Sequence, residues 1–226
     1  MNSILKEKTL GIIHASSLTI NAVAPYVKKY VPEISIMHLC DDTIQRDNIA
    51  AGPGVIPKVN YFKFAQYAHN LEEADVDLIL LACSTFNFAA ELARPQVNTP
   101  IMQIDRPMME TAVQTGKNIC LLATLATTVP SSERLLQICA NEAGKEINMK
   151  TILCEEAFEE YSKGNIDKHN EILLDQIDKV SKEVDCIAMA QLSMSALAPF
   201  LQNTAVPVYN SGDTCFSKIR TLLETT

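Results

Sequence analysis

An apolar segment that ends in polar residues occurs twice in the chain with the same pattern. This duplication limits the possible folds more than any other feature of the sequence. Residues 76–85, VDLILLACST, align without a gap with residues 184–193, VDCIAMAQLS. Both segments end in an alanine, one polar or reactive residue and then hydroxyl groups. Cys83 in the first half therefore corresponds to Gln191 in the second.

Two further pairs of segments repeat in the same order. Residues 10–19, LGIIHASSLT, and residues 119–128, ICLLATLATT, both pass from apolar residues directly into a turn rich in serine and threonine. Residues 34–42, ISIMHLCDD, and residues 147–156, INMKTILCEE, both end in a cysteine and two acidic residues. Three matched strand ends at similar separations predict a duplicated unit whose copies pack as a pseudo-twofold pair.

Short apolar runs alternate with longer amphipathic stretches along the whole chain, which is typical of strand–helix units built around parallel sheets. The predicted strands are Leu10–Ala15, Ile34–Leu39, Leu78–Cys83, Ile101–Ile104, Ile119–Ala123, Met149–Cys154, Ile187–Ala190 and Val206–Tyr209. We therefore expect an α/β fold with two lobes and mainly parallel sheets. Residues 1–105 plus 207–226 are predicted to form the lobe that carries Cys83, and residues 106–206 the lobe that carries Gln191.

Composition and charge exclude several classes of partner. The 226 residues are 47% hydrophobic and 20% charged, the ordinary mixture of a globular protein, so the whole chain is expected to fold. The net charge of -8, with 19 scattered Lys and Arg residues, opposes binding to nucleic acid. The apolar runs are too short to span the roughly 30 Å hydrocarbon core of a bilayer, so we predict no membrane association and a cytoplasmic location.

Cysteine and glycine patterns argue against bound groups. Seven cysteines are an odd number, and several lie inside apolar runs, so a disulfide framework is not expected. No C-x-x-C pair is present, and the four histidines lack the spacing of helix-borne metal ligands. The sequence contains neither G-x-G-x-x-G nor a P-loop. We therefore expect no metal site and no bulky cofactor.

In open parallel sheets, ligands bind beyond the carboxyl ends of the strands, where the repeated polar residues are placed. Cys83 lies at a predicted strand-to-helix turn, where unpaired backbone amides lower the pKa of a thiol and make it a base or nucleophile. The alternative for Cys83 is a packed thiol. The turns at Ser16–Ser17, Ser84–Thr85 and Thr124–Thr128 offer hydroxyls and amides that hold a small carboxylate. Each turn could instead be an ordinary helix N-cap, but three on one rim favour an anion site.

Three more polar residues follow predicted strands. His14 either orients or deprotonates the thiol or is a hydrogen-bonded core residue, and Glu155 has the same two interpretations. Asp105 contacts the substrate, caps the following helix or pairs with Arg106. The acidic run that starts at Glu155 is typical of a solvated helix.

Several of these segments occur together in a known family. LACSTF at 81–86, LLATLATT at 121–128 and the duplicated architecture resemble the aspartate/glutamate/hydantoin racemase superfamily over nearly the whole chain. HLCDD at 38–42, IDRPM at 104–108 and AQLSM at 190–194 are similar to one branch of it. The resemblance implies two three-layer α/β/α domains, a small carboxylate substrate held between them, no cofactor, and two cysteines acting on opposite faces of the α-carbon.

The resemblance also assigns roles by position. Cys83 matches the first catalytic cysteine, and Thr124 and Thr127 match the hydroxyl turn that holds the substrate carboxylate. Ser84 and Thr85 share that task.

The chain departs from the family pattern on both sides of the site. The second cysteine of the family falls on Gln191, an amide that cannot exchange a proton usefully. His14 replaces an aspartate, and Ser193 replaces a histidine. Racemisation then needs a second acid, for which Glu155 or His14 would have to serve.

The leading hypothesis is a cofactor-independent isomerase or racemase acting at the α-carbon of a small carboxylate, with Cys83 as the base. The alternatives are a one-cysteine decarboxylase or lyase, in which Cys83 protonates an enolate stabilised by hydroxyls and Gln191, and a catalytically silent binding protein. The predicted catalytic residues are Cys83, Gln191, His14 and Glu155. The predicted substrate-binding residues are Ser16, Ser17, Ser84, Thr85, Asp105, Thr124, Thr127, Thr128, Ser193 and Met194. A homodimer is ordinary for the family that the chain resembles.

Overall fold

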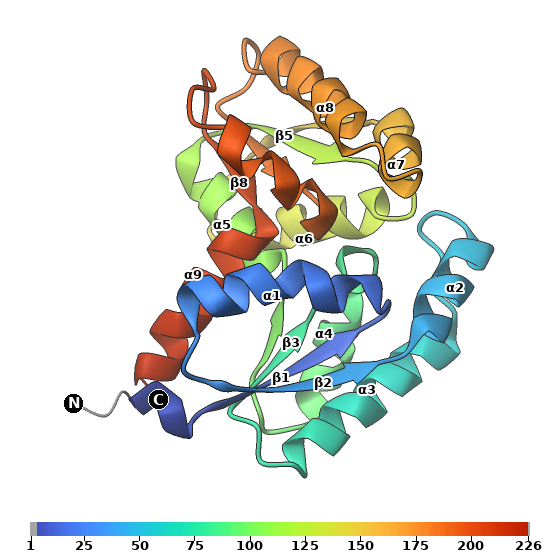
Figure 1. The fold of residues 1–226 in the computed structure, drawn as a ribbon, viewed down its shortest axis with the longest axis vertical. Helices are drawn as coiled ribbons and strands as arrows, with labels where there is room; N and C mark the ends of the chain where they lie inside the picture. Colours follow the sequence, from blue (N-terminus) through green and yellow to red (C-terminus); the bar gives the residue numbers. More distant parts are fainter. Residues whose placement is uncertain (1–3, 226) are drawn as a thin grey trace.

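A computed structural model describes residues 4–225, which form two lobes placed one above the other (Figure 1). The elements in chain order are η1 (Ile4–Glu7), β1 (Thr9–His14), α1 (Leu18–Tyr30), β2 (Ser35–Cys40), α2 (Asp42–Ala51), α3 (Lys58–Glu72), β3 (Leu78–Leu81), η2 (Ser84–Phe86), α4 (Phe88–Ala93), η3 (Arg94–Gln96), β4 (Ile101–Gln103), α5 (Arg106–Thr115), β5 (Asn118–Ala123), α6 (Val129–Glu142), β6 (Asn148–Leu153), α7 (Glu155–Ser162), α8 (Ile166–Val180), β7 (Cys186–Met189), η4 (Leu192–Phe200), β8 (Val208–Asn210) and α9 (Ser211–Thr225). All of the predicted strands are present, and their ends differ from the predicted ones by at most two residues. None of the described helices is both long and apolar enough to cross a membrane.

Each lobe is built on a four-stranded parallel sheet, and the two sheets share one strand order. It is β2-β1-β3-β4 in the first lobe and β6-β5-β7-β8 in the second. The register repeats as well: Leu10 pairs with Leu78 in the first sheet, and Ile119 pairs with Cys186 in the second. These are the positions that the sequence repeat aligns. The predicted α/β fold with two duplicated parallel sheets is therefore confirmed.

A repeated aspartate holds the start of the first strand in each sheet. Asp77 accepts a hydrogen bond from the backbone amide of Thr9 at 2.7 Å, and Asp185 accepts one from the amide of Asn118 at 2.7 Å. A backbone amide at a strand end needs an acceptor when it is shielded from water. This need gives a physical reason for the Val-Asp pair that precedes the third strand in both halves of the sequence.

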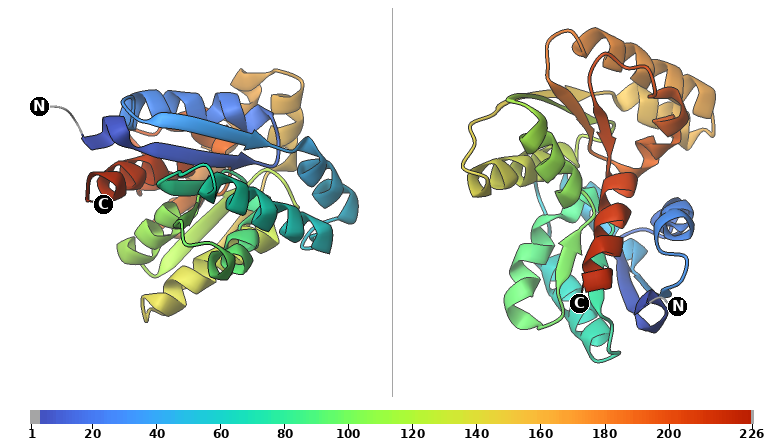
Figure 2. Two further views of the ribbon diagram at one scale, coloured as in Figure 1. Left: turned by 90° about the horizontal axis from the view of Figure 1, so that it is seen from below. Right: turned by 90° about the vertical axis from the view of Figure 1, so that its left-hand side faces the viewer.

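Helices cover both faces of each sheet, which gives three layers per lobe (Figures 1 and 2). In the first lobe α1 and α9 pack on one face around Phe216, and α3 and α4 pack on the other around Phe64 and Ala90. In the second lobe α5 and α6 cover one face, and α8 and η4 cover the other. All four residues of β3 and of β7 are buried, as continuous apolar strands of a doubly covered sheet should be.

The fourth strand of each sheet is followed by a helix that packs into the other lobe. Met108 of α5 lies in the core of the second lobe, and Phe216 of α9 lies in the core of the first. Figure 1 shows α9 passing from the upper lobe to the lower one. The chain returns to the first lobe between Asn210 and Ser211, after β8, because β8 is hydrogen-bonded to β7 in the second sheet. The sequence placed this return at residue 207.

The structure aligns β2 with β6 one residue differently from the sequence repeat, which paired Cys40 with Cys154. The amide of Asp41 donates to the carbonyl of His14, and the amide of Cys154 donates to the carbonyl of Ala123. Cys154 therefore occupies the place of Asp41, at the start of the following helix, and does not correspond to Cys40. The shared sequence of cysteine and two acids concealed this shift, because α7 begins one residue nearer to its cysteine than α2 does.

Candidate active site

A cavity of about 120 Å³ lies where the carboxyl ends of the two sheets face each other. Seven predicted site residues line it, namely Ser16, Cys83, Ser84, Thr85, Thr128, Gln191 and Ser193. The other lining residues are Leu18, Thr19, Ala22, Gln45, Ala82, Ile104, Leu125, Phe158, Tyr161 and Leu192. None of these side chains carries a formal charge, so the cavity offers one thiol, several hydroxyls and amides to a ligand.

Cys83 follows β3 and begins the short helix η2. It is 8% exposed, and the backbone amides of Thr85 and Phe86 lie on the helix that it begins. Burial raises the pKa of the Cys83 thiol to about 12, the two amides lower it, and the negative charge of Asp105 raises it further. The sequence-based expectation of a lowered pKa rested on the amides alone, and burial outweighs them. Cys83 is therefore a neutral thiol at physiological pH.

Gln191 follows β7 in the second lobe, at the position equivalent to Cys83. Its Oε1 accepts three hydrogen bonds from the turn after β5: from the Thr124 amide at 2.5 Å, the Thr124 hydroxyl at 3.0 Å and the Leu125 amide at 3.2 Å. Backbone amides can only donate, so these contacts fix the orientation of the side-chain amide. Nε2 is then the polar atom of Gln191 left for a ligand in the cavity.

Two hydroxyls meet across the lobes beside the cavity. Thr85 of η2 and Thr128, which precedes α6, lie with their Oγ1 atoms 3.1 Å apart. Thr128 is the N-cap of α6 but makes no side-chain capping bond, and the same holds for Ser17 before α1. The hydroxyl of Ser17 instead donates to Asp42 at 3.0 Å, away from the lining residues. The hydroxyls of Thr128 and Ser17 therefore do not cap their helices.

His14 is fully buried and does not line the cavity, but it is one hydrogen bond from a residue that does. Its Nδ1 lies 2.6 Å from the hydroxyl of Thr19, and its Nε2 lies 2.9 Å from Nδ1 of the exposed His38. Thr19 donates its own proton to the carbonyl of Ser16 at 2.7 Å, so Nδ1 of His14 carries the proton that Thr19 accepts. Burial, and then the neighbouring His38, lower the pKa of His14 to about 4.

Asp105 does not line the cavity, and its carboxyl group links distant parts of the chain. It is fully buried, its Oδ1 accepts from the Ser211 hydroxyl at 2.5 Å, and its Oδ2 accepts from the Asn87 amide at 3.0 Å. Ser84 also donates to it. Burial raises the pKa of Asp105, and the three donors lower it. Asp105 thus joins η2, α4 and α9 and acts on Cys83 through its charge.

Besides Ser17, His14 and Asp105, four more predicted site residues lie outside the cavity lining. Glu155 is exposed at the first turn of α7, and Met194 is buried in the core of the second lobe. Thr124 is buried and reaches the site through Gln191. Thr127 lines a neighbouring cavity.

Sequence reasoning missed the helical residues that complete the cavity wall. Thr19 comes from α1, Gln45 from α2, and Phe158 and Tyr161 from α7. The aromatic pair three residues apart in an otherwise acidic helix was a usable signal, because residues at this spacing share one helix face. Thr19 carried no comparable signal.

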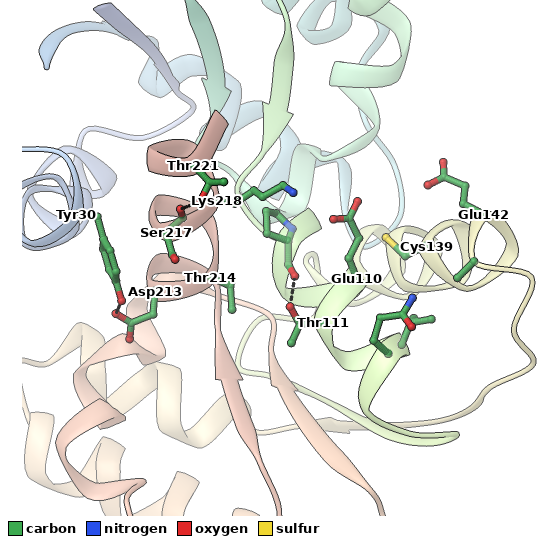
Figure 3. Close-up of a pocket in the computed structure, with 14 residues that line it drawn as sticks. Tyr30, Glu110, Thr111, Cys139, Glu142, Asp213, Thr214, Ser217, Lys218 and Thr221 are labelled. Carbon is green, nitrogen blue, oxygen red and sulfur yellow. Dashed lines mark hydrogen bonds between the residues drawn. The ribbon is translucent and has the colours of Figure 1, made fainter. Parts of the chain in front are cut away.

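The largest cavity, about 880 Å³, lies elsewhere and is formed by α5, α6 and α9 (Figure 3). Its walls carry Glu110, Glu142 and Asp213, with Lys218 as a cation, and neither Cys83 nor Gln191 reaches it. Within residues 4–225 no three His, Cys, Asp or Glu side chains are grouped as metal ligands. The smaller cavity is the better candidate, because it joins a thiol, fixed amide donors and the carboxyl ends of both sheets.

Comparison with known proteins places the chain among racemases. The family model described as Asp/Glu/Hydantoin racemase matches residues 35–218. A search of curated protein sequences finds no match.

Solved structures share the fold at low sequence identity. An aspartate racemase homologue from Pyrococcus horikoshii is 21% identical, with a TM-score of 0.70, over 96% of this chain and 99% of that one. An allantoin racemase from Klebsiella pneumoniae is 17% identical, with a TM-score of 0.70, over 96% and 88%. A glutamate racemase from Bacillus anthracis is 14% identical, with a TM-score of 0.68, over 97% and 83%. Because the family model matches residues 35–218, well over half of the sequence, the chain belongs to the Asp/Glu/hydantoin racemase family.

Proposed function

We propose that the protein is a cofactor-independent isomerase of the racemase type that moves a proton at the α-carbon of a small carboxylate, with Cys83 as the group that exchanges it. The observation that carries this proposal is the cavity itself, which joins the Cys83 thiol of one lobe to the Gln191 amide of the other. Family membership supports the reaction class.

Gln191 would serve as a hydrogen-bond donor. With Oε1 held by Thr124 and Leu125, its Nε2 is available to donate to a carboxylate or enolate oxygen. Such donors stabilise the negative charge that appears on oxygen when the α-proton leaves. The hydroxyls of Ser84, Thr85 and Ser193 line the same cavity and would hold the substrate carboxylate.

The second proton-transfer group would be the Thr19 hydroxyl, backed by His14. Of the two candidates for this role, Glu155 is exposed outside the cavity, whereas His14 contacts Thr19 at 2.6 Å. In one direction the Cys83 thiol first gives its proton to water, and the resulting thiolate removes the α-proton. The Thr19 hydroxyl turns away from the Ser16 carbonyl and gives its proton to the opposite face. Thr19 then recovers a proton from Nδ1 of His14, Nε2 of His14 takes one from Nδ1 of His38 at 2.9 Å, and the exposed His38 takes one from water.

A second candidate function is favoured by the raised pKa of Cys83. A thiol with a pKa of about 12 is a ready proton donor and a poor resting base. In a decarboxylase, the bond to the carboxylate breaks, its electron pair becomes an enolate held by Gln191, and carbon dioxide leaves. Cys83 then gives its proton to the carbon and recovers one from water.

Proton NMR of the wild-type protein in deuterated buffer separates these functions. A panel of amino, hydroxy and malonate-type acids is incubated with the protein, and the α-proton signal, optical rotation and released carbon dioxide are followed. Loss of the α-proton with loss of rotation supports the isomerase, and carbon dioxide release supports the lyase. No change in any acid of the panel would contradict both.

A further inference from the structure

The helix α7 supplies an aromatic part of the wall of the candidate active-site cavity. Phe158 and Tyr161, one helical turn apart, are the two α7 side chains that line it. Leu18 and Ala22 of α1 add further apolar surface. A charged substituent of a substrate would lie beside α7 without a counter-ion from the uncharged lining, which is unfavourable. An uncharged, apolar substituent fits this wall.

The placement of α7 depends on contacts with the rest of the second lobe, because the helix is short. It spans eight residues, and isolated helices shorter than about 12 residues are marginal in water. α7 and α8 lie side by side (Figure 1). Ala157 is the one buried residue of α7, in the same core cluster as Leu173 of α8. A contact made through a small alanine leaves much of the orientation of α7 to other interactions.

His169 of α8 supplies such an interaction. It is fully buried, and its Nδ1 lies 2.8 Å from the carbonyl oxygen of Ala157. A carbonyl oxygen only accepts, so Nδ1 carries the proton and donates. Among the described residues this is the one hydrogen bond that a side chain of α8 gives to α7. The His169 ring also lies against Tyr161, with the ring centroids 5.2 Å apart. His169 therefore contacts both the backbone of α7 and a ring that lines the cavity.

The second ring nitrogen of His169 argues that this residue is not there for stability. Its Nε2 is buried and makes no hydrogen bond within the described chain. With the proton on Nδ1, Nε2 is an acceptor whose burial destabilises the fold. An apolar side chain at this position would avoid that cost but would lose the bond to Ala157. The Tyr161 hydroxyl has no hydrogen-bond partner among residues 4–225, so packing on His169 is what holds its ring.

We propose that His169 is a positioning residue, which holds α7 so that Phe158 and Tyr161 contact an apolar, uncharged substituent of the small carboxylate substrate. His169 does not line the cavity and acts on the substrate through Tyr161. The inference rests on the proposed function, because it takes the cavity at Cys83 as the substrate site.

A binding measurement tests this without turnover. Propionate and 4-methylpentanoate, which differ by one isopropyl group, are titrated by ligand-observed NMR into wild type, His169→Leu, His169→Asn, Tyr161→Ala and the matched control His69→Leu. His69 is an exposed histidine of α3 outside the cavity. His169→Asn keeps an amide donor near the place of Nδ1, and His169→Leu removes the donor. Circular dichroism verifies that each variant is folded.

We expect wild type and His69→Leu to bind 4-methylpentanoate about tenfold more tightly than propionate, as partial burial of three more carbon atoms allows. His169→Leu and Tyr161→Ala should each reduce this preference to about twofold and leave propionate binding unchanged. His169→Asn should restore most of the preference. The variant that combines His169→Leu with Tyr161→Ala should lose no more of it than either change alone, because both act through one contact.

Equal binding of the two acids by wild type, or a preference that survives His169→Leu, would overturn the proposal. An equal loss of affinity for both acids in His169→Leu would also overturn it, because it would show a general structural role. A preference that depends on His169, without α-proton exchange in any acid, would keep the positioning role and refute the proposed function. Exchange that requires Cys83, with equal binding of the two acids by wild type, would do the reverse.

Discussion

The contacts of Gln191 make a sharp prediction about stability. Gln191→Met keeps the length of the side chain but removes the acceptor of three hydrogen bonds, and it leaves the amides of Thr124 and Leu125 and the Thr124 hydroxyl without a partner. At about 0.5–1.5 kcal/mol per hydrogen bond, the free energy of unfolding should fall by about 2–4 kcal/mol. For a chain of this length that corresponds to a melting temperature lower by on the order of 10 °C.

Gln191→Glu is the matched variant, because a carboxyl group in either protonation state keeps an acceptor oxygen for the same three donors. We expect its free energy of unfolding at pH 5.5 to stay within about 1 kcal/mol of wild type. Urea unfolding followed by circular dichroism measures both variants. If Gln191→Glu loses as much stability as Gln191→Met, Oε1 is not held as described and the donor role of Nε2 falls with it.

Three further predictions concern buried groups. The pKa of His14 is about 4 in the folded protein and 6.5 in the unfolded chain, so acid protonates the unfolded chain first. The contribution of His14 to the free energy of unfolding is therefore fully present above pH 6.5 and is lost as the pH falls toward 4. Urea unfolding of wild type should show this loss as about 3 kcal/mol, and His14→Gln should not show it. If the free energy of unfolding of both proteins changes equally with pH, this prediction is wrong. Asp105→Asn removes a charge that raises the pKa of Cys83, so iodoacetamide should label Cys83 faster at pH 8.5 by mass spectrometry, and an unchanged rate would refute the coupling. In Gly212→Ala the added methyl would lie 2.2 Å from Cζ of Tyr26, so we expect about 1–3 kcal/mol of destabilisation, and an unchanged melting temperature would disprove this packing.

The fold could be read from the sequence because its signals are local and repeated. Continuous apolar runs identify strands covered on both faces, and the duplicated Val-Asp pair marks the same strand in each sheet. The place where the chain crosses back was harder to find. It depends on whether residues 208–210 pair with β7, and a three-residue strand has little pattern of its own.

The candidate site was only partly readable. Cys83 and Gln191 stood out because the repeat aligns them, and both line the cavity. Thr19 did not, because it reaches the cavity only through the packing of α1, and the aromatic spacing that marks Tyr161 was overlooked within the acidic run of α7. The direction of the Cys83 pKa shift was also missed, since local amides are visible in a sequence but the burial of a thiol by the folded chain is not.

The central claim is that Cys83 exchanges a proton with the α-carbon of a small carboxylate. The direct test is the rate of deuterium incorporation at that carbon, measured by mass spectrometry for the most active acid of the panel, in wild type, Cys83→Ser and Cys40→Ser. Cys40 is an exposed thiol outside the cavity and serves as the control. We predict that Cys83→Ser lowers the rate by at least a hundredfold and that Cys40→Ser matches wild type. Exchange by Cys83→Ser at the wild-type rate would contradict the account.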